Sequence, residues 1–329
     1  MTPTRIRIII GVVAGFVGVL GAGRPAFAQI ASGSDIAGSW MPFAHEDFVD
    51  RIPGPEPLDW TGLPLSDEGR KVGLSYSVSR NSTIERQCAL HPPQYLVLGP
   101  FGIRITAETD PFTGATVAWH VGAWEDRAPT TIWMDGRPHP SDNAPHTRGG
   151  FETGKWLGNT LTTHTTHIKA GIIRRNGVQV SDQVTLTTHY IRNGDLMTVL
   201  MFIDDPVNLT EPHAISKDFR LQQETTLDST GPPCIITYEG TDSNSVAHYL
   251  PGKNPLTGEL FKTYGIPREA ALGGAETMYP EYRKKLKAAY VRPEKCPHNC
   301  GGLPGGPPGG FPGGPRGGGP PGAPPPPPR

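Results

Sequence analysis

The chain has 329 residues, with 30 Lys and Arg against 31 Asp and Glu and a formal net charge of -1. This balance leaves no overall positive field and argues against a protein dedicated to nucleic-acid binding. The 42 Gly and 37 Pro predict a turn-rich fold rather than a helical one, and a hydrophobic content of 36% is enough to bury a core.

The first residues have the features of a secretory signal peptide. Arg5 and Arg7 precede an apolar run over 8–20, and a small-x-small cleavage motif lies at 26–28. The run is shorter than the roughly 20 apolar residues of a membrane-spanning helix. We therefore predict a signal peptide over residues 1–28 and a periplasmic or secreted mature protein with no membrane span after cleavage.

The mature chain begins with an N-terminal extension over residues 29–80, in which a short helix is predicted near Ser66. From 81 to 295, short segments rich in Val, Ile and Thr alternate with Gly and Pro turns, which is typical of a β domain. The first predicted strands are Gln94–Leu98, Ile103–Glu108, Ala115–Val121 and Thr130–Met134.

Two Asn-Gly dipeptides, Asn176-Gly177 and Asn193-Gly194, predict β-hairpins. The strands around and after them are Thr160–Ile173, Val178–Ile191, Leu196–Ile203, Ala214–Gln222 and Cys234–Glu239. Consecutive short strands of this kind favour an antiparallel meander that closes as a lipocalin-like β-barrel of about 8–10 strands. A barrel of this size can hold one small ligand.

The C-terminal part begins with a predicted helix over Pro280–Tyr290, which has proline in its first turn. Residues 296–329 are predicted to be a Cys-x3-Cys segment followed by a disordered tail, because 301–329 alone contain 12 Gly and 12 Pro. The alternative is that this tail contacts a partner in the cell envelope.

The four cysteines are Cys88, Cys234, Cys296 and Cys300. Export makes disulfides available, and four cysteines allow three pairings. The favoured pattern joins Cys296 to Cys300 and Cys88 to Cys234. In the alternative, Cys296, His298 and Cys300 are ligands of zinc or copper.

Histidines give the most specific geometric prediction. His164 and His167 lie on one predicted strand and His189 on the next. If the Asn176-Gly177 hairpin has a two-residue turn, His164 and His189 are direct cross-strand neighbours, roughly 5 Å apart at Cβ. Such a pair predicts half of a metal site, with zinc or another divalent metal as the cofactor, or an acid/base pair. The alternative is a Thr-rich outer face on which both histidines are exposed.

A second cluster is the loop Met134–Pro140, which contains Asp135, Arg137 and His139. Together these residues supply an anion clamp and a proton carrier. The alternative is a structural Asp-Gly turn in which the arginine pairs with the aspartate. The chain has no Gly-x-Ser-x-Gly, Walker, dinucleotide or His-Glu-x-x-His motif, so the sequence gives no support to a serine hydrolase, nucleotide enzyme or zincin.

The string Ile132–Pro140, Ile-Trp-Met-Asp-Gly-Arg-Pro-His-Pro, resembles the Met-Asp-Gly-Arg-x-His-Pro segment of a large group of exported bacterial proteins, abundant in soil acidobacteria and proteobacteria. Other similar pieces are Thr166-His167, Arg175-Asn176-Gly177, Ser181-Asp182, Leu209-Thr210-Glu211-Pro212 and Tyr279-Pro280-Glu281-Tyr282. The resemblance covers roughly residues 62–290 and implies export but no particular activity. The group has Trp-Glu-Gly-Asp where this chain has Trp156-Leu157-Gly158-Asn159, so a role for that acidic pair does not carry over.

Two functional hypotheses follow. In the first, the exported barrel binds a small, largely apolar or aromatic ligand, with Met197, Met201, Trp133 and Arg175 as ligand-binding residues. In the second, the protein is a periplasmic hydrolase, lyase or isomerase. Its catalytic residues are then His164, His167, His189, Asp135 and Arg137, with His164 and His189 as metal ligands.

Overall fold

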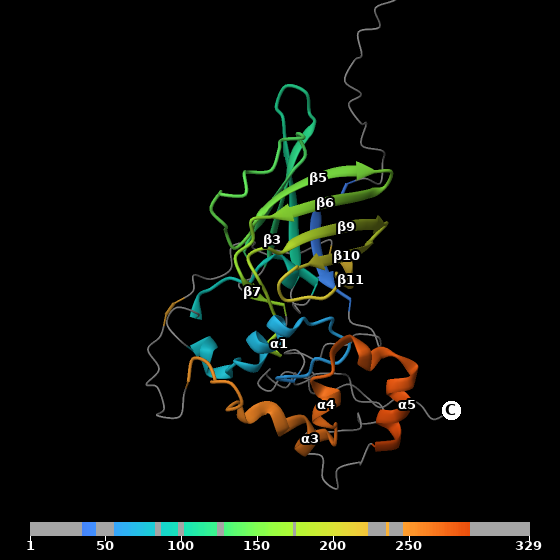
Figure 1. Cartoon of the computed structure of the whole chain (residues 1–329). Helices are drawn as coiled ribbons and strands as arrows, with labels where there is room; N and C mark the ends of the chain where they lie inside the picture. Colours follow the sequence, from blue (N-terminus) through green and yellow to red (C-terminus); the bar gives the residue numbers. More distant parts are fainter. Residues whose placement is uncertain are drawn as a thin grey trace, which may run out of the picture.

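The computed structural model describes residues 35–43, 56–82, 87–97, 102–123, 128–173, 176–222, 235–236 and 246–289. Within these residues, nine strands form a closed barrel and two more form a small separate sheet (Figure 1). The barrel strands are β1 (Gly38–Pro42), β2 (Ile103–Thr109), β3 (Thr116–Ala123), β4 (Thr130–Trp133), β5 (Phe151–Leu157), β6 (Thr160–Thr166), β9 (Thr185–Asn193), β10 (Leu196–Asp204) and β11 (His213–Gln222). The small sheet consists of β7 (Gly171–Ile172) and β8 (Gln179–Val180). The predicted mainly β fold with a barrel is confirmed, whereas the predicted signal peptide and tail lie outside the described residues.

The short strand β1 closes the barrel. The order around the barrel is β1-β11-β10-β9-β6-β5-β4-β3-β2, and β1 pairs with both β11 and β2. Trp40, at the centre of β1, faces Leu221 on one side and Ile103 on the other and is fully buried. Without β1 the sheet would have two open edges.

One pair departs from the predicted antiparallel meander, because β4 and β5 run parallel. Parallel neighbours cannot be joined by a tight turn and need a crossover connection. Here the crossover is the segment 134–150, which contains the Asp-Gly-Arg-Pro-His-Pro string.

Alternation of side chains along the strands builds the core. On β10, Met197, Val199, Met201 and Ile203 are buried, whereas the residues between them are not. This period of two places every second residue inside the barrel. The buried side chains of the barrel and of the segment around Trp60 belong to one hydrophobic cluster.

Helices gather at one end of the barrel (Figure 1). The α-helices are α1 (Asp67–Leu74), α3 (Glu259–Tyr264), α4 (Arg268–Ala271) and α5 (Pro280–Ala289), and the 3₁₀ helices are η1 (Val78–Ser82), η2 (Pro93–Val97), η3 (Pro255–Gly258) and η4 (Gly274–Met278). The predicted helices near Ser66 and over 280–290 are confirmed as α1 and α5. None of the helices in the described part of the chain has the length and apolar character needed to cross a bilayer.

The helix α1 is attached directly to the turn between β10 and β11. The Ser66 side chain caps α1 by accepting from Gly69 N at 3.0 Å, and its hydroxyl donates to Val207 O at 2.6 Å. A Cβ at Gly69 would lie 2.2 Å from Asn208 O, so only glycine allows this close approach.

Several strand predictions need correction. The segment predicted as strand Gln94–Leu98 forms the 3₁₀ helix η2 instead. The strands β1 and β5 were not predicted. Both lack a sequence signal that separates them from a loop, because β1 ends in Pro42 and β5 contains Gly154. Of the predicted strand over 234–239, only Ile235 and Ile236 are described, and they are not in a strand.

The predicted hairpin at Asn176-Gly177 is shorter than expected. Gly177 has a φ of 95° and lies in the connection between β7 and β8, whereas β6 and β9 pair directly in the barrel. Their register joins His164 to Thr187 and Thr162 to His189. The predicted direct pairing of His164 with His189 is therefore wrong by two residues, because Ile173 N bonds to Val178 O across the connection, so that four residues and not the expected two separate the paired positions.

A buried carboxylate organises the end of β10. Asp205 is 1% exposed. It accepts from Ser181 N at 2.6 Å and from the Ser181 hydroxyl at 2.7 Å, and from the backbone N–H groups of Val207 at 3.0 Å and Asn208 at 3.3 Å. These bonds tie the residue after β8 to the turn that receives α1.

We expect Asp205→Ala to lower the free energy of unfolding by about 3 kcal/mol, because it leaves several buried donors without an acceptor. The neighbouring exposed Asp204 provides the matched control, and Asp204→Ala should change stability by less than about 0.5 kcal/mol. Urea denaturation of both variants measures the difference. Equal stabilities would show that Asp205 does not hold this end of the barrel.

Candidate functional site

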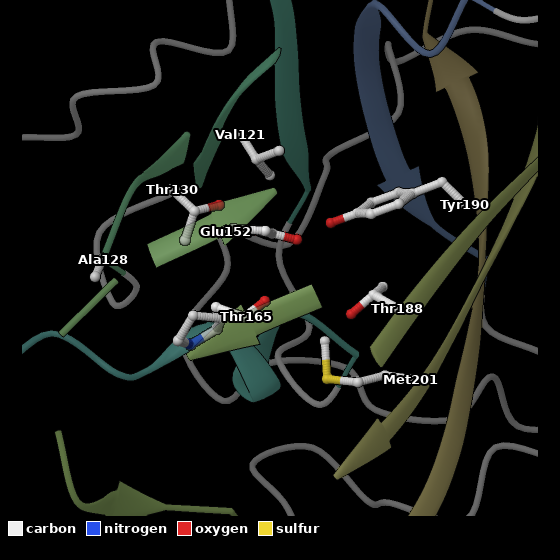
Figure 2. A pocket seen from close by; sticks show the side chains of 9 residues that line it. Val121, Ala128, Thr130, Glu152, Thr165, Thr188, Tyr190 and Met201 are labelled. Carbon is white, nitrogen blue, oxygen red and sulfur yellow. The ribbon is translucent and has the colours of Figure 1, made fainter. Parts of the chain in front are cut away.

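The barrel interior contains a small cavity beside one ionisable side chain. Its volume is about 10 Å³, which is space for a single water molecule. The residues that line it come from six strands, from η2 and from the segment before β4: Pro93, Val121, Ala128, Thr130, Glu152, Thr165, Thr188, Tyr190 and Met201. Figure 2 shows these side chains around the cavity and labels all of them except Pro93.

Glu152 is the acid of this cavity. It lies on β5, where it pairs with Ile132 of β4 and Thr165 of β6, and it is 3% exposed. Burial raises the pKa of Glu152 from 4.5 to about 7, because the charged carboxylate loses its hydration inside the barrel. Hydrogen bonding from Thr163, Thr165 and Thr130 opposes this effect and does not overcome it.

Hydroxyl groups surround the carboxyl group. The side-chain oxygens of Thr163 and Thr165 are fully buried and have no hydrogen-bond partner of ordinary geometry, so their interaction with Glu152 is a loose one. In Figure 2 the Glu152 carboxyl and the Tyr190 hydroxyl point toward each other, and the hydroxyls of Thr165 and Thr188 face the same space. The cavity therefore combines one titrating acid with several hydroxyls that are able to donate or accept.

The helix η2 contributes to the wall of the cavity in addition to the barrel strands. Pro93 at its start lines the cavity, and the same helix packs against β10 and β11. Through these contacts η2 connects the cavity with the β10–β11 side of the barrel. The next residue, Gln94, is fully buried, and neither its Oε1 nor its Nε2 has a hydrogen-bond partner in the described residues.

The predicted histidines lie on the outer face of the barrel instead. On β6 the side chains of Leu161, Thr163 and Thr165 are buried, whereas His164 is exposed. His189 lies on β9 at the matching outer position, where its Nδ1 is 2.9 Å from the Thr162 hydroxyl. Neither side chain reaches the interior cavity.

His167 lies just past the end of β6. Alternation along a longer strand would place its side chain on the inward face with Thr163 and Thr165, but the strand ends at Thr166 and His167 adopts a left-handed φ of 57°. Its Nε2 is 2.9 Å from Ser141 O. The ring therefore contacts the crossover segment and does not enter the barrel.

Histidines hold the crossover segment against β6. His139 lies between two hydroxyls, with Nδ1 2.8 Å from Thr166 Oγ1 and Nε2 2.9 Å from Thr153 Oγ1. His139 and His164 have ring centroids 5.2 Å apart, as do His146 and His167. Burial lowers the pKa of His139, and the imidazoles of His164 and His167 lower it further. A neutral His139 is suited to bridging the two threonines.

The remaining crossover residues form a surface ion pair. Arg137 Nη2 lies 2.5 Å from Asp135 Oδ2, and the guanidinium stacks 3.5 Å above the ring of Trp133. The hydrogen bond from Arg137 lowers the pKa of Asp135. This is the geometry of the structural alternative, in which the arginine pairs with the aspartate of an Asp-Gly turn.

Of the two methionines predicted to bind a ligand, only Met201 lines the cavity. Both are buried on β10, but Met201 lines the cavity whereas Met197 packs elsewhere in the core. Trp133 is on the outer side with Arg137, and Arg175 lies outside the described residues. Cys88 is described and is not a free thiol, while the other three cysteines lie outside the described residues, so their pairing stays a prediction.

No group of three His, Cys, Asp or Glu side chains in the described ranges is arranged to hold a metal ion. The central residue that sequence reasoning missed is Glu152. Its signal was weak: a single acid in Gly150-Phe151-Glu152-Thr153-Gly154, on a strand that was itself not predicted. Only the closed barrel brings Glu152, Tyr190 and Met201 together.

Comparison of the chain with protein-family models, curated proteins and solved structures gives no match.

The raised pKa of Glu152 predicts a pH-dependent stability. Between pH 4.5 and about 7 the unfolded chain has lost this proton whereas the folded protein retains it. The proton that Glu152 retains contributes fully to the free energy of unfolding below about pH 4.5. This contribution falls by about 3 kcal/mol as the pH rises to about 7.

Glu152→Gln keeps the shape but cannot titrate. We expect the stability of this variant relative to wild type to rise by about 3 kcal/mol across that pH range, as measured by urea denaturation. Glu281→Gln, at an exposed position on α5, is the control and should follow the wild-type curve. If the free energies of unfolding of wild type and Glu152→Gln changed with pH in the same way, the raised pKa would not belong to Glu152.

Proposed function

We propose that this protein binds a small molecule inside the barrel, with a polar group of the ligand at Glu152. The observation that carries the proposal is a buried acid with a pKa of about 7 beside a cavity lined by the hydroxyls of Thr165, Thr188 and Tyr190. A perturbed acid in a concave, partly apolar site is characteristic of binding and catalytic sites.

The lining favours an amphipathic ligand over the largely apolar one predicted from the sequence. Glu152, Thr165, Thr188 and Tyr190 supply the polar side of the cavity. The apolar side comes from Val121, Met201, Ala128 and Pro93. Because the cavity itself has room for only one water molecule, the body of a ligand must displace η2 at Pro93. The proposal includes export to the periplasm or medium, on the basis of the N-terminal signal-like segment.

Met201 and Met197 allow a matched test. Met201→Ala enlarges the cavity next to Glu152, whereas Met197→Ala makes the same truncation on the same strand away from it. Each should lower the free energy of unfolding by about 2–5 kcal/mol. We expect small aromatic probes with a polar group, such as benzyl alcohol and benzylamine, to restore stability to Met201→Ala much more than to Met197→Ala.

Thermal denaturation with and without each probe measures the effect. Combining Met201→Ala with Glu152→Gln should weaken the response, because the polar group of the probe loses its carboxyl partner. If the probes stabilised Met201→Ala and Met197→Ala equally, the cavity beside Glu152 would have no preference for them over another cavity in the core, which would contradict the proposal.

A catalytic role is a second candidate, favoured by the pKa of Glu152, which suits a group that exchanges protons near neutral pH. The predicted histidine-lined version does not use the interior cavity, since His164 and His189 lie on the outer face. In the catalytic version Glu152 is the acid/base group. Its signature is incorporation of deuterium from D₂O into carbon positions of a bound ligand by wild type but not by Glu152→Gln, detected by mass spectrometry.

A further inference from the structure

We infer that the polar group recognised at the interior site is a primary ammonium, so that the ligand class is a small primary amine. This inference rests on the proposed interior binding function. It follows from the size of the cavity, the signs of the charges around it and the hydrogen-bonding capacity of its lining.

Size comes first. The cavity of about 10 Å³ accepts one water-sized group. An ammonium head contains a single non-hydrogen atom and fits such a space, whereas a carboxylate, phosphate or guanidinium group contains several. The apolar residues Val121 and Met201 then face the carbon chain that carries the head group, which enters where η2 is displaced at Pro93.

Charge also favours a cation. The residues that line the cavity include no Lys, Arg or His, and Glu152 is the only acid among them. The elements packed around Glu152 present Thr130 from β4, Thr165 from β6 and Tyr190 from β9, of which only Tyr190 is titratable. Lys217 is buried on β11 but does not line the cavity, and its Nζ lies 6.0 Å from the Phe219 ring centroid. The lining therefore offers an anionic group no cation, and it presents a like charge once Glu152 is ionised.

Hydrogen bonding distinguishes an ammonium from a neutral polar group. An ammonium has three donors and no acceptor, which matches an ionised carboxylate surrounded by hydroxyl oxygens. Thr163 and Thr165 supply buried hydroxyls without a partner of ordinary geometry, and Thr165 lies at the cavity wall. With an ammonium bound, the Thr165 oxygen accepts from the ligand while its hydrogen is donated to the carboxylate. A buried cation and carboxylate neutralise each other only when such additional bonds are made.

Proton linkage gives a test that depends on the sign of the ligand charge. Near pH 6 Glu152 is protonated in the free protein, so an ammonium ligand must expel that proton to form an ion pair. Near pH 8.5 the carboxylate is already ionised and nothing is expelled. A ligand that accepts a hydrogen bond from the neutral acid shows the opposite linkage, with proton uptake at the higher pH.

The experiment uses benzylammonium, benzyl alcohol and benzoate as cationic, neutral and anionic probes of similar shape. Isothermal titration calorimetry of the full mature chain in buffers of different ionisation enthalpy counts the protons exchanged. We expect benzylammonium to bind at least about tenfold more tightly than the other two, with release of about one proton near pH 6 and none near pH 8.5. Methyl NMR signals of Met201 should shift on binding, while those of Met197 should not.

Glu152→Gln should weaken benzylammonium binding by at least about tenfold and abolish the proton release, whereas Glu281→Gln should change neither. If Glu152→Gln does not fold, the pH dependence of the wild-type linkage alone decides the question. Tighter binding of benzyl alcohol or benzoate at the same methionine would overturn the amine assignment and leave interior binding intact. Failure of all three probes to move the Met201 signal would contradict the amine assignment and interior binding together.

Discussion

The closure of the barrel by β1 is the constraint on which the site depends. This five-residue strand pairs with both β2 and β11, and Trp40 at its centre is fully buried between them. Closure removes the sheet edges and excludes water from the interior. That exclusion is what raises the pKa of Glu152 to about 7, since desolvation is the largest influence on this carboxyl group. The chemistry proposed for Glu152 on β5 therefore depends on a contact made on the other side of the barrel.

The parallel pair β4–β5 gives a structural explanation for the most distinctive string of the sequence. A parallel pair needs a crossover, and the segment 134–150 supplies it on the outer surface. Within this segment Asp135 forms an ion pair with Arg137. His139 contacts Thr153 of β5 and Thr166 of β6, and so attaches the segment to the barrel. The crossover also fixes how β5 enters the barrel, and so the position of Glu152 two residues after its end.

Much of the fold could be predicted from the sequence because its signals are local. The alternating burial of β10, the turn at Asn193-Gly194 and the capped start of α1 at Ser66 all follow from short stretches of chain. The strands β1 and β5 could not be predicted, because their residues become strands only through pairing with distant partners. The register of β6 with β9 was also mispredicted, because four residues and not two separate the paired Ile173 and Val178, which shifts every pair of this hairpin.

The site itself was less accessible to sequence reasoning than the fold. Histidines were predicted as site residues because imidazole ordinarily titrates near neutral pH, yet His164 and His189 lie on the outer face of the barrel. Glutamate ordinarily titrates well below neutral pH, and only burial makes Glu152 a group of comparable chemistry. Met201 was among the predicted ligand-binding residues and does line the cavity, because alternation on β10 is enough to place it inside.

The central claim is that Glu152 is an acid held near neutrality by burial in a closed barrel. Carbon-13 NMR of the glutamate side-chain carboxyl groups, assigned with Glu152→Gln, follows its titration directly. The account predicts a midpoint of about 7 for Glu152. A midpoint close to the ordinary value of 4.5 would show that water reaches the carboxylate, and would contradict both the closed interior and the binding site built on it.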